Sequence, residues 1–373
     1  MKRKQTLLVI PLALILAGSC LVYGESSEDG NSKLGHVSFH RPLTPLLGTK
    51  RVLAMLVSHE SLKPSAALTA EKMRALIEGV KKIYADASNN TVFLEPTVVP
   101  EPVLLPGNIS DYQVPKVPYG ILHAAANREV VAKYGSELDP DTFDAVVYFY
   151  PTDTNVEPFG VLRFKHTFGL RFKPAVANIG LGQDANPPAI AHEIGHALFM
   201  YAHAASADPK TGELLKGEGD PYEVMGYGLN RNLFPAGHLS MAYRYYWGWT
   251  KAEEITIVTE PGTFSLEPGR ALLVPTNKDN LLWLEIIRAE QAYGDETGGL
   301  LVHIDKAGEK GISHSTLDMT PATEYKADLH MTPGQSISFE AREITYVKRI
   351  EKSGSKTPSA EIKIGDDEKS SKP

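Results

Sequence analysis

The sequence has 373 residues and a single cysteine, Cys20. No disulfide can form within the chain, so its stability must come from packing. Basic residues are outnumbered, with 38 Lys and Arg against 45 Asp and Glu, and the net charge is −7. A chain this acidic is a poor candidate for binding nucleic acid or an anionic membrane surface. No Gly-x-Ser-x-Gly motif is present, so the sequence does not indicate a serine hydrolase with a nucleophile elbow.

The N-terminus combines basic "MKRKQ" with the apolar run "TLLVIPLALILAGS". The run is short for a transmembrane helix and Pro11 interrupts it, so we interpret residues 1–24 as an export signal. The segment "LAGSC" resembles a bacterial lipobox, which implies lipidation of Cys20 and membrane contact only through that anchor. Ordinary cleavage after "VYG" is the alternative, giving a secreted protein. Removal of residues 1–19 takes away three basic residues and leaves a charge of about −10 (−7 minus 3).

The rest of the chain divides by composition into segments. Residues 25–45 are polar and predict a flexible linker. Apolar strands and amphipathic helices follow in 46–251, and short strands separated by turn residues fill 252–350. The charged residues 351–373 predict a disordered tail. We therefore expect an α+β protein, with a catalytic domain at 46–251 and a smaller β-sandwich-like domain at 252–350.

The segment "NPPAIAHEIGHALFMYAHA" carries the chemistry. Asn186 suits a helix N-cap, and the two prolines after it suit a first turn. His192 and His196 then lie on one face, about 40° apart at 100° per residue, where two imidazoles can bind one zinc ion. Glu193 lies beside them, within reach of a water on the metal. A partly exposed helix with surface histidines is the alternative, because the motif His-Glu-x-x-His is short.

A catalytic zinc site needs a third protein ligand and one open position. On a straight helix His203 would lie about 10.5 Å along the axis from His196, too far for one ion. Either the helix ends near residues 199–202 and the chain turns back, or an acidic residue is the third ligand. The following loop offers such competitors: Glu213, Glu218, Asp220 and Glu223.

The segments "AHEIGHALFMYAHA", "GDPYEVMGYG" and "HLSMAYRYYWGW", in that order, resemble a secreted metzincin-type zinc metallopeptidase. The likeness is to immune inhibitor A-like peptidases and, more distantly, to gametolysin-like ones. It implies a zincin fold, with a twisted mixed sheet, a zinc helix and a methionine turn. It also implies His192, His196 and His203 as zinc ligands.

Two further roles follow from the resemblance. Met225 in "VMGYG" would form the methionine turn, and Tyr227 would approach the transition-state oxyanion. The spacing departs from the usual pattern, because the third histidine stands eleven residues after the first and Met200 occupies the position where glycine would be. If the helix must end there with a residue other than glycine at positive φ, that conformation costs about 1 kcal/mol or more.

The sequence therefore predicts an exported zinc metalloendopeptidase that acts on a protein or peptide, with Glu193 as general base. An inactive, peptidase-like envelope lipoprotein that binds a protein partner is the alternative. The acidic run 139–144 offers a calcium site as a weaker expectation, with an acidic turn before a strand as the alternative. His303 is predicted to be structural.

Overall fold

In the computed structural model of the protein, all described residues belong to one compact unit, 38–373. The described ranges are 46–60, 69–112, 119–151, 175–181, 186–199, 203–217, 219–226, 239–276, 280–287, 299–308, 311–323, 329–351 and 358–367. The predicted signal, Cys20 and the predicted linker therefore lie outside them. Among the described helices, none combines the length and apolarity needed to cross a membrane.

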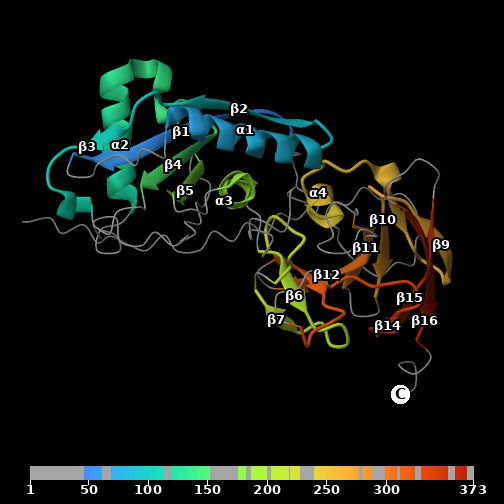
Figure 1. Ribbon diagram of the computed structural model, residues 1–373. Coiled ribbons are helices and arrows are strands. Elements are labelled where there is room, and N and C mark those ends of the chain that lie inside the picture. Colours follow the sequence, from blue (N-terminus) through green and yellow to red (C-terminus); the bar gives the residue numbers. More distant parts are fainter. Residues whose placement is uncertain are drawn as a thin grey trace, which may run out of the picture. The chain divides into compact units, whose positions relative to one another are not determined.

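The first sheet has the strand order β2–β1–β4–β5, with β3 also paired to β1 (Figure 1). Every described pairing in it is parallel. We expected a mixed sheet, but among the described residues this sheet contains no antiparallel strand. The strands are β1 (Gly48–His59), β2 (Val92–Val98), β3 (Val103–Leu105), β4 (Ala145–Pro151) and β5 (Ala175–Leu181).

Helices cover both faces of this sheet. Alternate residues of β1 point to opposite faces, and those on both faces are buried against helices. Leu53, Met55 and Val57 share a core cluster with α2, whereas Val52, Ala54 and Leu56 share another with α1 and α3. The helices are α1 (Ala70–Ala87), α2 (Tyr119–Tyr134), α3 (Pro187–Phe199) and the short α4 (Met241–Tyr246). Short 3₁₀ turns occupy η1 (Ile109–Tyr112), η2 (Gly135–Leu138), η3 (Pro140–Thr142) and η6 (Ala252–Glu254).

Two further sheets follow, with the orders β7–β6–β13–β12–β11–β10–β8 and β14–β15–β16–β9. Side chains from both sheets form a single hydrophobic cluster, as expected for face-to-face packing. The strands are β6 (Ala205–Ala207), β7 (Leu214–Lys216), β8 (Ile255–Ile257), β9 (Gly262–Leu266), β10 (Ala271–Pro275), β11 (Leu281–Ile286), β12 (Leu300–Gly308), β13 (Gly311–Leu317), β14 (Ser336–Phe339), β15 (Arg342–Ile350) and β16 (Ser359–Asp366).

The predicted disordered tail at 351–373 is wrong for β16. This strand pairs with both β15 and β9. Ala360, Ile362 and Ile364 are buried, with more exposed residues between them. The period of two was present in the sequence, but the high charge of the segment concealed it.

The seven-stranded sheet crosses the domain boundary that we expected between residues 251 and 252. Its β6 and β7 come from the segment directly after α3, and β6 pairs in parallel with β13. The chain is thus a mixed α/β protein with several sheets, and the region containing the histidines contributes strands to the β-rich part.

The contact between α1 and α3 requires glycine at position 79. A Cβ built there would lie 2.5 Å from Cγ of Pro187, in the first turn of α3. We expect Gly79→Ala to lower the free energy of unfolding by about 1–3 kcal/mol through overpacking, although alanine favours the helix by about 1 kcal/mol. Gly217→Ala is the control, because nothing lies within 4 Å of its Cβ position. Denaturant unfolding measures both, and a more stable Gly79→Ala variant would contradict this packing.

Candidate metal site

The helix that carries the histidine motif begins as predicted. The Asn186 side chain accepts a hydrogen bond from the Ala189 amide at 2.9 Å, and α3 runs from Pro187 to Phe199. Ile190 and Ile194 pack in the core beneath the first sheet. His192, Glu193 and His196 are buried too, at 0%, 6% and 6% exposure. The alternative of a surface helix with solvated histidines is therefore wrong.

A tyrosine on the neighbouring helix supports this segment. The Tyr84 hydroxyl on α1 donates a hydrogen bond to the carbonyl oxygen of Ala191 at 2.7 Å. Burial raises the pKa of Tyr84 well above its ordinary value, so the hydroxyl keeps its proton. The contact fixes α3 one residue before the first histidine of the motif.

The first two histidines face each other across one helical turn. Nε2 of His192 and Nε2 of His196 are 3.0 Å apart, and the ring planes are nearly perpendicular at 86°. Two nitrogens bound to a tetrahedral zinc at 2.0–2.1 Å would lie about 3.3 Å apart. The spacing in the structure is close to that value.

The third histidine joins them because α3 ends at Phe199. The His203 ring centroid lies 4.7 Å from that of His196 and 5.3 Å from that of His192. One ligand atom from each of the three residues lies within 4.8 Å of the others. His203 therefore lies beside the two helix histidines and not where a straight continuation of α3 would place it.

The orientation of His192 is set by a backbone carbonyl. Its Nδ1 lies 2.7 Å from the carbonyl oxygen of Val224, which can only accept a hydrogen bond. Nδ1 must therefore carry the proton, and the lone pair of Nε2 is left facing His196. Histidines that bind metals commonly have such a partner on the other ring nitrogen.

The segment that provides this carbonyl is a tight turn around Met225. The Gly226 amide bonds the Glu223 carbonyl at 2.9 Å, and the Met225 carbonyl accepts from the Ala204 amide at 2.8 Å. Met225 is fully buried in the cluster that also contains Ile194. A Cβ on Gly226 would lie 2.2 Å from the Asp220 carbonyl oxygen, so the turn needs glycine there. The turn thus contacts the chain at both His192 and the residue after His203.

Three imidazole nitrogens suit zinc by donor type, number and spacing. Among the described residues, no other group of three histidine, cysteine or acidic side chains satisfies the same distance criterion. The acidic run 139–144, our weaker calcium expectation, is used differently. Asp139 caps η3 through the Asp141 amide, and Asp144 accepts from the Arg51 amide at 2.8 Å.

The remaining predicted site residues are distributed unevenly. Glu193 is buried in α3 directly after His192. Tyr227 and Glu218 lie outside the described residues. Of the other acidic competitors for the third position, Glu213 is exposed, Asp220 accepts a hydrogen bond from Thr316, and Glu223 binds the Ser240 amide at 2.5 Å. In the structure, His203 lies with the two helix histidines in one group of ligand atoms, and Glu213, Asp220 and Glu223 are not part of this group.

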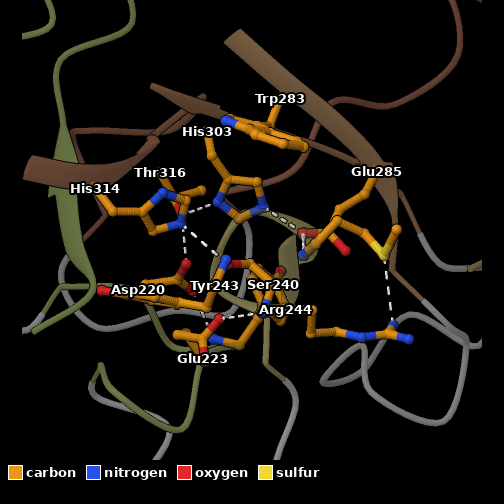
Figure 2. A network of polar contacts seen from close by, with 12 residues as sticks. Asp220, Glu223, Ser240, Tyr243, Arg244, Trp283, Glu285, His303, His314 and Thr316 are labelled. Atoms are coloured by element: carbon orange, nitrogen blue, oxygen red, sulfur yellow. Dashed lines mark hydrogen bonds and ion pairs between the residues drawn. The ribbon is translucent and has the colours of Figure 1, made fainter. Parts of the chain in front are cut away.

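Glu223 belongs to a buried polar network that the sequence analysis missed (Figure 2). Burial raises the pKa of Glu223 well above its ordinary value, and the nearby Asp220 carboxylate adds to that effect. The Ser240 amide opposes it by donating to the carboxyl group. Glu223 therefore keeps its proton to a higher pH in the folded chain than in the unfolded chain.

The comparisons with known proteins add little. The chain matches no known family profile and no curated protein sequence. The crystal structure of catalytic inactive OgpA from Akkermansia muciniphila, in complex with an O-glycopeptide (glycodrosocin) substrate, is similar with a TM-score of 0.30 and 10% identity. The match covers 83% of this chain and 91% of that chain. These values are too low to carry an argument about function, which must rest on the geometry of the site.

If His203 is the third ligand, His203→Ala should weaken zinc binding by at least about tenfold, because a donor is lost. Glu213→Ala and Glu218→Ala are the matched controls and should bind zinc as the wild type does. Competition against a chromophoric chelator gives the three affinities. Normal affinity in His203→Ala with a large loss in Glu218→Ala would identify the acidic residue as the ligand.

Glu223→Gln should alter how stability depends on pH. Above the unfolded pKa of about 4.5, the folded wild type holds a proton that the unfolded chain has released, so its free energy of unfolding falls as pH rises. Glutamine does not titrate and can still accept from the Ser240 amide. The variant should therefore gain stability relative to the wild type between pH 5 and pH 8, as measured by urea unfolding. A constant difference over that range would mean that Glu223 is ionised in the folded protein.

Proposed function

We propose that the protein is a zinc metalloendopeptidase of the metzincin type, related in its mechanism to immune inhibitor A-like peptidases. The observation that carries the proposal is the group formed by His192, His196 and His203, with His192 oriented by the Val224 carbonyl. The helix, its end at Phe199 and the turn around Met225 support it. They follow one another in the order that the resemblance implies.

In this proposal the three imidazoles hold the metal through unprotonated ring nitrogens. A zinc ion in such a site supplies an activated water and a positive charge that polarises a scissile carbonyl group. Glu193, beside His192 on α3, accepts the proton of the attacking water and later delivers it to the leaving amine. Tyr227 donates a hydrogen bond to the developing oxyanion.

Cellular location is proposed from the N-terminal sequence alone. The export signal and the lipobox-like "LAGSC" support an envelope lipoprotein anchored through Cys20, whose peptidase domain meets proteins or peptides outside the cytoplasm. A secreted form follows if cleavage occurs after Gly24 instead.

The base role of Glu193 can be separated from metal binding. Glu193→Gln keeps the shape of the side chain but cannot take a proton, so we expect unchanged zinc content and a loss of casein cleavage of about 10²-fold or more. Glu78→Gln, an exposed change on α1 that removes only an ion pair with Lys81, is the control. Full cleavage by Glu193→Gln would reject the role. A wild type that binds zinc but cleaves nothing in a broad peptide library would favour the partner-binding alternative.

A further inference from the structure

Three strands of the seven-stranded sheet carry a buried polar face. On β12, Val302 and Ile304 enter the core between the sheets, while His303 and Asp305 alternate with them and are 1% and 2% exposed. Buried polar groups need hydrogen-bond partners. The contacts of this face therefore identify the segments that cover it, as Figure 2 shows.

One line of contacts leads from this face to Asp220. His303 lies opposite Thr316 on β13, and its Nδ1 is 2.8 Å from the Thr316 hydroxyl. That hydroxyl donates to Oδ2 of Asp220. Oδ1 of Asp220 accepts from the Tyr222 amide at 2.8 Å. Thr316 thus holds the segment 219–226, which contains the turn that orients His192.

A second line reaches the same turn through α4. Asp305 contacts Nδ1 of His314 at 2.7 Å, and Nε2 of His314 lies 3.1 Å from the Ser240 hydroxyl. The Ser240 amide then donates to the Glu223 carboxyl group. The order Ser–His–Asp matches that of a hydrolytic triad, but Ser240 is fully buried and caps α4, so no substrate reaches its hydroxyl.

The segment containing His203 is attached to the same strand. β6 begins two residues after His203 and pairs with β13, where Ser206 is opposite Thr316. Gly219 packs directly on Ser206, since a Cβ at Gly219 would lie 2.8 Å from the Ser206 amide nitrogen. The segment that follows His203 and the segment that contains Val224 therefore meet at one position of β13.

We propose that β13 positions the histidine cluster, with Thr316 and His314 as positioning residues that fix the segments of His203 and Val224 against α3. The inference rests on the proposed function for its consequence in metal binding, but the anchoring itself concerns the metal-free protein. A peptidase site of this kind would depend on a strand more than 100 residues beyond its histidines, since Thr316 follows His203 by 113 positions (316 minus 203).

The test compares Thr316→Val, which keeps the shape and removes the hydroxyl, with Thr316→Ser, which keeps the hydroxyl. Thr345→Val on β15 is the matched control, because this hydroxyl bonds that of Ser336 at 2.8 Å within the four-stranded sheet. Hydrogen exchange of the Ala204 amide is measured in the metal-free proteins, relative to the Ile344 amide. Zinc affinity and the Co²⁺ absorption spectrum are measured as well.

We expect Thr316→Val to exchange the Ala204 amide about tenfold faster and to bind zinc about tenfold more weakly with an altered Co²⁺ spectrum. Thr316→Ser and Thr345→Val should match the wild type. Unchanged exchange in Thr316→Val would overturn the anchoring, whether or not the wild type binds zinc. Faster exchange in a protein whose wild type binds no zinc would support the anchoring and reject the proposed function.

Discussion

The histidine cluster depends on the position of His203, which lies beside the helix histidines although it follows α3 in the chain. His203 stands four positions after Phe199, the last residue of α3, and two positions before β6. A helix cannot bring three donors to one ion at this spacing, because its rise separates the last from the first two. The segment that begins at His203 is held from outside the helix, by the pairing of β6 with β13 and by the Met225 carbonyl bonded to the Ala204 amide.

The polar face of the sheet shows the energetic cost of this arrangement. Four carboxyl groups, those of Asp220, Glu223, Glu285 and Asp305, are almost fully buried together with His303 and His314. Burial of so many ionisable groups is favourable only when each is paired or neutral. Here Asp305 receives bonds from Trp283 at 2.6 Å and from Tyr246, while burial raises the pKa of Glu223 well above its ordinary value. Such a network costs stability unless it is complete, so it favours one arrangement of the loop and strands.

Sequence reasoning found the parts of the site that depend on local pattern. The capped start of α3 and its apolar side could be predicted, because each follows from the spacing of a few neighbouring residues. The position of His203 could not be predicted in this way, because spacing alone left open whether the helix ends before it or an acidic residue is the third ligand. Features that depend on long-range contacts could not be predicted from the sequence. The pairing of β6 with β13, the hydrogen bond from His192 to the Val224 carbonyl and the partners of Glu223 join residues far apart in the chain, and composition does not reveal them. The strand at 359–366 was missed because its charged residues outweighed a clear alternation of Ala360, Ile362 and Ile364.

The position of β16 has a consequence for the time at which the protein can become stable. This strand lies between β15 and β9, and β16 is the one described partner of β9. Residues 262–266 can therefore form strand hydrogen bonds in this sheet only after residues 359–366 have been synthesised. During synthesis, the four-stranded sheet therefore stays incomplete until that late segment has been made.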